Sequence, residues 1–338
     1  MFFNSTTLIL LLLVSISCQS DLYAQIDPLN FSNESVQHCL DFVYNGEFER
    51  AKTTYLALPT SQQQIKEALE IFCMRWEEVP IQFSKRKNTY LEALTKANSR
   101  PRIENPESTT HIFLSITTKL LLAEYYFGKN DRLQALWYGK KAYPLLTKFL
   151  DEQRTEPEFF FVKGLYLYYV DFYNQKGFFY RATLRLFRKG NKEQGLELLR
   201  KAAHNPSLAQ TEALIYMAHI TLRLENNPVG ALSYSQKLLN KYPQNLKFRE
   251  LYIENLFAAG KYEDGERLLR EHLKVENPYY KIPALFLSGC YQLDYLKQPV
   301  RAKSTFDECL NLADGYKPLE EYRKKVELKW EAYNKPNL

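Results

Sequence analysis

The sequence predicts an all-α fold, built as a stack of helix-turn-helix repeats that ends in a C-terminal capping helix. Three observations predict it. Glycine is scarce, with 12 residues in 338, which disfavours a β-sandwich with its many tight turns. A turn pattern of glycine, an aromatic residue and a small residue at fixed spacing recurs along the chain. Its small residues recur every 34 to 37 positions in the C-terminal half, the length of two short helices with their turns.

The recurring turn reads NGEFERA at residues 45–51 and AGKYEDG at 259–265. The segment KGNKEQG at 189–195 repeats the spacing with lysine in place of the aromatic residue. Each second helix opens on a small residue, because two helices that cross closely exclude a large side chain there. These small residues are Ala51, Ala135, Gly195, Ala231, Gly265 and Ala302.

The periodicity divides the chain into seven helix pairs and a last helix. The pair at 62–99 fits the pattern least, and Pro144 should bend or shorten the second helix of the third pair. The fourth pair carries an insertion at 177–190. The predicted pairs cover 33–59, 62–99, 109–150, 159–204, 210–243, 246–274 and 282–313, and the capping helix covers 317–333.

This pattern resembles that of tetratricopeptide repeat (TPR) proteins, whose unit is about 34 residues long. The stretch KGLYLYY at 163–169, followed by RKGNKEQGL at 188–196, is similar to a group of exported bacterial proteins of this type, in the style of Bacteroidetes. No unit has the consensus tryptophan of the first helix. The resemblance implies a right-handed superhelical solenoid and a habit of binding proteins, and it implies no substrate.

The N-terminus is typical of an export signal. Residues 8–16 (LILLLLVSI) form an apolar run that suits a signal peptide and is too short to span a bilayer. Cleavage after Ala24 would define a signal peptide at 1–24, although no lysine or arginine precedes the apolar run. Lipid attachment at Cys18 is the alternative. We therefore expect an exported chain, periplasmic or associated with the outer membrane, without a transmembrane segment.

In domain terms, we expect divergent helical repeats at 25–105 and TPR-like repeats at 106–204. Regular repeats with the capping helix follow at 205–338.

Enzyme signatures are absent from the sequence, which has no phosphate-binding glycine loop, no HExxH and no GxSxG. The net charge of +6 is mild and dispersed, so we expect no nucleic-acid partner. The cysteines lack metal-ligand spacing, and we expect neither metal nor cofactor. Cys39, Cys290 and Cys309 fit as small packing residues, with a disulfide between Cys290 and Cys309 left open.

Residues 159–180 contain eleven aromatic side chains, and two interpretations of them are open. Core packing is favoured for the stretch as a whole, whereas some rings could line a concave groove and contact a partner. The arginines of the insertion recur at helical spacing and could form a basic stripe, although a solvated face is favoured. The candidate partner-binding residues are Phe161, Tyr168, Tyr169, Phe172, Arg181, Arg185, Arg188, Tyr291 and Tyr295.

The sequence thus predicts a non-enzymatic scaffold of the cell envelope that holds a protein or peptide in its groove. The alternative is a surface lipoprotein that binds carbohydrate or another nutrient.

Overall fold

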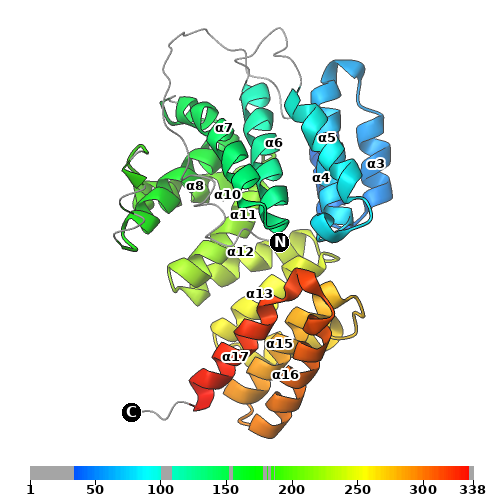
Figure 1. The fold of residues 1–338 in the computed structure, drawn as a ribbon, viewed down its shortest axis with the longest axis vertical. Helices are drawn as coiled ribbons and strands as arrows, with labels where there is room; N and C mark the ends of the chain where they lie inside the picture. The colour runs from blue at the N-terminus through cyan, green and yellow to red at the C-terminus, as the bar shows by residue number, and fades with distance from the viewer. Residues whose placement is uncertain are drawn as a thin grey trace. The chain divides into compact units, whose positions relative to one another are not determined.

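The computed structural model describes residues 34–99, 109–151, 155–177, 181, 184, 185 and 187–334. Within these residues the chain forms fifteen α-helices and no strand, so the predicted all-α class is confirmed. Consecutive helices pack as adjacent pairs (Figure 1). The chain divides into two compact units, one ending at Ala213 and one beginning at Leu214, a boundary that lies within one helix. The predicted signal peptide and Cys18 lie outside the described residues.

In the first unit each helix packs against the next one along the chain, and α2 also packs against α4. The bounds agree with the predicted pairs to within a few residues. The helices are α2 (Glu34–Tyr44), α3 (Phe48–Leu56), α4 (Gln63–Glu77), α5 (Lys87–Ser99), α6 (Thr109–Gly128), α7 (Arg132–Asp151), α8 (Pro157–Asn174) and α10 (Lys192–His204). Pro144 does not end α7, which continues as a helix to Asp151.

The second unit begins within α11 (Gln210–His219), which passes into a short π-helix at Ile220–Leu224. Here α13 and α15 pack against each other as well as against their sequence neighbours, and the final helix packs on α15 and α16. The helices are α12 (Pro228–Lys241), α13 (Leu246–Ala258), α14 (Tyr262–His272), α15 (Pro278–Asp294), α16 (Pro299–Asp314) and α17 (Glu321–Asn334).

The turns inside five of the helix pairs share one backbone feature, a residue with positive φ placed five positions before the small residue of the second helix. The left-handed conformation reverses the chain within a few residues and is easiest for glycine. Three of the five positions carry other residues, so the turn geometry recurs more faithfully than its sequence. The left-handed residues are Gly46 (φ 81°), Asn130 (63°), Asn226 (50°), Gly260 (74°) and Lys297 (57°).

Glycines allow a close helix crossing in the first unit, between α8 and α10. A Cβ atom added at Gly195 would lie 2.5 Å from the backbone nitrogen of Tyr168 and 2.8 Å from the carbonyl oxygen of Gly164. Both distances are below van der Waals contact, so the two backbones touch at this point. The predicted small residue of the second helix is therefore required here.

A buried polar cluster in the first unit draws its side chains from four helices, α2, α4, α6 and α11. The Arg75 guanidinium of α4 lies 3.3 Å from both carboxylate oxygens of Glu124 on α6. The Tyr44 hydroxyl of α2 donates to a Glu212 carboxylate oxygen over 3.0 Å. Burial raises the pKa of Glu212, and the nearby Arg75 charge opposes that rise. Removing one member would leave a polar or charged group buried without its partner, so the cluster ties these helices together.

Candidate functional site

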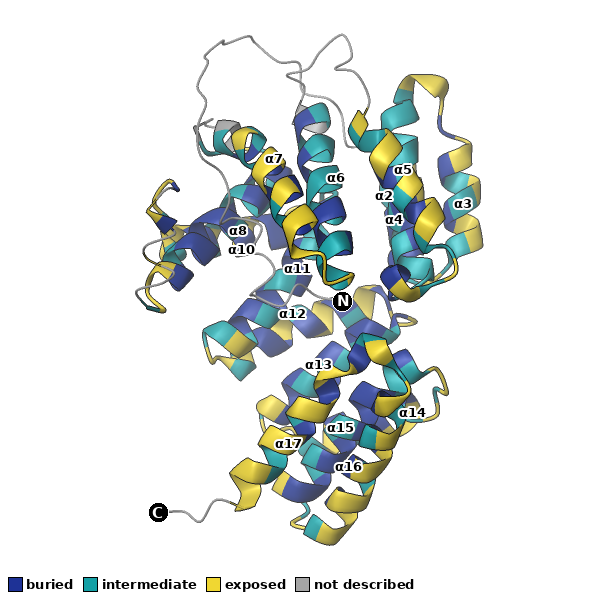
Figure 2. Ribbon diagram, viewed as in Figure 1, coloured by how far each residue is buried: buried dark blue, intermediate teal, exposed yellow. Residues whose placement is uncertain are grey.

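The aromatic side chains predicted on α8 lie mostly in the protein interior. Tyr168 is 0% exposed, Tyr169 and Phe172 are also buried, and Phe161 is half-buried. The rings of Tyr168 and Phe172 stack at 5.7 Å, and Figure 2 shows α8 as one of the most buried helices. Core packing therefore holds for α8, and Tyr168, Tyr169 and Phe172 offer no free surface to a partner. A helix with apolar residues all round is buried all round, which accounts for the burial of these three side chains.

The basic insertion is partly described. Arg181, Arg185 and Arg188 are exposed, and the Arg185 backbone N–H donates to the Arg181 carbonyl over 3.2 Å. Arg181 and Arg185 thus lie one helical turn apart. The segment at Arg188 is held against the core, because its carbonyl accepts a hydrogen bond from the buried Tyr166 hydroxyl over 2.8 Å.

Tyr291 and Tyr295 belong to a partly exposed aromatic stack in the second unit. The ring of Tyr262 stacks on Tyr295 at 4.4 Å and the ring of Phe257 stacks on Tyr291 at 5.4 Å. Tyr295 is 41% exposed, and its hydroxyl donates to Glu263 over 2.6 Å. These two candidates therefore remain accessible to a ligand.

The four described cysteines are free thiols, and Cys39, Cys73 and Cys309 are buried. The Cys309 thiol donates to the Ile282 carbonyl over 3.5 Å, and burial raises its pKa to about 12. A buried thiol of raised pKa is a poor nucleophile, so Cys309 serves packing.

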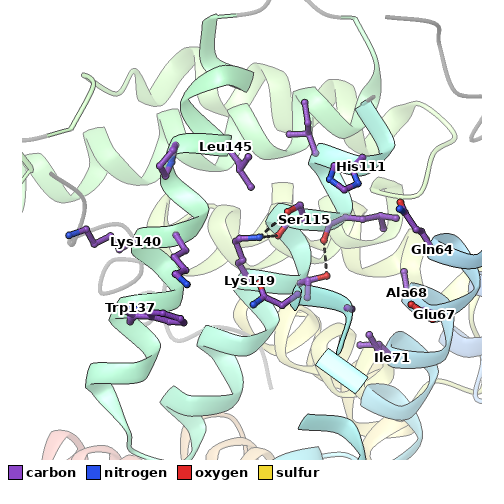
Figure 3. Close-up of a pocket in the computed structure, with 17 residues that line it drawn as sticks. Gln64, Glu67, Ala68, Ile71, His111, Ser115, Lys119, Trp137, Lys140 and Leu145 are labelled. Atoms are coloured by element: carbon purple, nitrogen blue, oxygen red, sulfur yellow. Dashed lines mark hydrogen bonds between the residues drawn. The ribbon is translucent and has the colours of Figure 1, made fainter. Parts of the chain in front are cut away.

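The first unit contains a pocket of about 670 Å³. Figure 3 shows side chains of α6 between those that come from α4 and those that come from α7. The end of α5 closes one side. The lining residues are Gln64, Glu67, Ala68 and Ile71 of α4, Ala97 and Asn98 of α5, His111, Ile112, Leu114, Ser115, Thr118 and Lys119 of α6, and Trp137, Lys140, Lys141, Pro144 and Leu145 of α7.

Helical periodicity explains why these residues share a pocket. The other lining residues of α7 stand three, four, seven and eight positions after Trp137, so they occupy one face of that helix. Ile71 and Ile112 are buried and form the apolar interior, whereas Trp137, Lys140 and Lys141 are exposed at the rim. The pocket therefore combines an apolar interior with a basic, aromatic rim.

The acidic side chain that lines this pocket has a charged partner, whereas two of its lysines have none among the described residues. Glu67, its only lining acid, lies 3.7 Å from the Lys96 ammonium and accepts a hydrogen bond from Gln63 over 3.1 Å. Lys140 and Lys141 make no ion pair with any residue that the structure describes. The Lys119 ammonium donates to the Ser115 hydroxyl over 2.9 Å (Figure 3).

Sequence reasoning missed this pocket, although one signal was visible. Trp137, Lys140 and Lys141 stand at helical spacing on a predicted second helix, and tryptophan is rare in this chain, with 3 residues. What could not be read from the sequence is which residues of α4 and α6 face that surface.

The comparisons with known proteins give no further assignment: no protein-family model, no curated protein and no solved structure matches this chain. The described residues contain no group of histidine, cysteine and carboxylate side chains that could hold a metal ion. None of their helices is both long and apolar enough to cross a bilayer.

Proposed function

We propose that this chain is a non-enzymatic scaffold that binds a segment of another protein in the pocket between α4, α6 and α7. The observation that carries the proposal is the rim of this pocket, where an exposed tryptophan and two lysines without ion pairs border an apolar interior. Exposed tryptophan next to a concave apolar surface is typical of the residues that dominate protein interfaces.

The repeated architecture supports the same proposal. Stacked helix pairs present a long, pre-formed surface whose side chains are fixed before a partner arrives, which lowers the entropy lost on binding. We propose that the pairs are TPR-like repeats arranged as a right-handed solenoid. The five left-handed turns placed alike before a small residue support this, because such a repeat is built from one turn used again and again.

We also propose that the chain acts outside the cytoplasm, in the periplasm or at the outer membrane. The apolar run at 8–16 supports export. Labelling cells with a lipid precursor tests whether Cys18 carries an anchor, and N-terminal sequencing of the exported protein tests cleavage after Ala24.

The binding proposal is tested by cross-linking in the cell envelope, with the full chain as bait and mass spectrometry as the readout. Trp137→Ala removes the rim anchor, and Leu133→Ala is the matched control. Leu133 lies on the same helix, is 81% exposed and does not line the pocket. We expect a partner captured by wild type and Leu133→Ala and lost with Trp137→Ala. Capture that ignores Trp137 would contradict the proposed site.

Carbohydrate binding is the second candidate, favoured by the aromatic stack of the second unit. The flat rings of Tyr262 and Tyr295, stacked at 4.4 Å and partly exposed, offer a face on which a sugar ring can lie. A glycan array decides this alternative. Signals lost in Tyr295→Ala would support it, and an array without signals would remove it.

A further inference from the structure

The charges of the pocket rim indicate which chemical class of segment it binds. We infer that the pocket accepts an acidic peptide segment in which carboxylates flank one bulky apolar side chain. This inference rests on the proposed function, since it names the partner chemistry of that same site.

The rim of the pocket carries positive charge. Lys140 and Lys141 are exposed at the rim and make no ion pair within the described part of the chain, although ion pairs are frequent elsewhere on this surface. The one acid of the lining, Glu67, already lies 3.7 Å from the Lys96 ammonium. A ligand that supplies carboxylates to the two lysines therefore gains charge-assisted hydrogen bonds without breaking an existing ion pair.

The shape of the pocket places this positive charge at the mouth of an apolar interior. The Lys141 ammonium lies over the Trp137 indole, 3.5 Å from the ring centroid, so the positive charge is held at the pocket mouth. Inside, Ile71 and Ile112 form an apolar part of the pocket, whose volume of about 670 Å³ is large enough to take a bulky apolar side chain of a peptide. Carboxylates at the mouth and an apolar group in the interior fit both parts at once.

The wall of the pocket contains a hydrogen-bonding group, the side chain of Asn98. The side-chain oxygen of Asn98 is enclosed there and has no hydrogen-bond partner among the described residues. An enclosed acceptor without a donor is unfavourable, so a side-chain rotation that turns this oxygen towards the pocket, where a peptide N–H could donate to it, would relieve that cost. A simple anion has no such donor.

The experiment is selection from a random peptide library displayed on phage, with the full chain, its Trp137→Ala variant and its Leu133→Ala variant as separate baits. We expect wild type and Leu133→Ala to enrich peptides with surplus aspartate or glutamate around an aromatic or aliphatic residue. Trp137→Ala should not enrich them. Enrichment that depends on Trp137 without an acidic surplus would overturn this inference and leave the proposed function standing. If no enrichment depends on Trp137, both the inference of an acidic segment and the proposed function fail at this pocket.

An enriched peptide, made with an amidated C-terminus, then quantifies the charge contribution by fluorescence anisotropy. Lys140→Glu/Lys141→Glu should weaken its binding by about tenfold or more, because two attractions become repulsions. Lys303→Glu/Lys324→Glu changes the net charge equally on exposed positions outside the pocket, and we expect less than about a twofold effect. With glutamine in place of the peptide's acids, the rim variant should bind like wild type. Equal weakening by both lysine variants would overturn the inference.

Discussion

The ammonium group of Lys141 lies over the indole ring of Trp137, 3.5 Å from its centroid. Both residues belong to α7, one helical turn apart, and both remain exposed at the mouth of the pocket. Binding of a partner costs this tryptophan little side-chain entropy, because its ring is already held in place. Both residues are therefore positioned by a helix of the repeats at the binding surface that we propose.

The first prediction concerns the left-handed turns. Gly260→Ala should lower the free energy of unfolding by about 1 kcal/mol, because alanine disfavours its φ of 74° and no atom lies within 4 Å of the added Cβ. Lys297→Gly at the equivalent turn, with φ of 57°, should leave stability unchanged or raise it by up to about 1 kcal/mol. Urea denaturation followed by circular dichroism measures both. Equal losses in the two variants would contradict the shared turn geometry.

The crossing of α8 and α10 gives a second prediction. Gly195→Ala would place a Cβ 2.5 Å from the Tyr168 backbone nitrogen, so it should destabilise the first unit by about 3 kcal/mol or more. Gly315→Ala is the control, because its Cβ would lie no closer than 4.0 Å to a neighbour and its φ is negative. Thermal unfolding of the full chain compares the two. A Gly195→Ala chain as stable as wild type would show that the helices do not cross so closely.

Stability should depend on pH through His272 of α14. This side chain is fully buried, and neither ring nitrogen has a hydrogen-bond partner in the described residues. Burial lowers its pKa from 6.5 to about 4, and the charges of Lys247 and Arg249 add to that effect. Between these values the unfolded chain binds the proton and the folded chain does not. Stability is therefore full above about pH 6.5 and falls as the pH drops towards 4, by about 3 kcal/mol.

His272→Phe removes this titration and keeps an apolar ring in the same space. Urea denaturation at pH 7 and at pH 4.5 should show a smaller loss of stability for the variant than for wild type. The difference between the two chains isolates His272, because every other titrating group is common to both. Identical pH dependence would mean that His272 is not buried in its neutral form.

Helix positions were predictable from the sequence because local signals define them. The turn patterns at 45–51 and 259–265 located two of the second helices, and α3 and α14 each begin three residues before the predicted small residue. The prediction was less successful for surfaces. Tyr168 and Trp137 are both aromatic residues on predicted helices, yet the first is 0% exposed and the second 45% exposed. That difference in exposure depends on which helices pack around α8 and α7. The periodicity within one helix does not reveal these neighbours.

The central claim, that the pocket between α4, α6 and α7 binds a protein segment, is tested most directly by isothermal titration calorimetry. The titrant is the segment recovered by cross-linking or by peptide selection, and the full chain is compared with its Trp137→Ala and Leu133→Ala variants. We predict a Kd at least about tenfold weaker for Trp137→Ala, equivalent to about 1.4 kcal/mol or more, and an unchanged Kd for Leu133→Ala. The same Kd for wild type and Trp137→Ala would contradict the account.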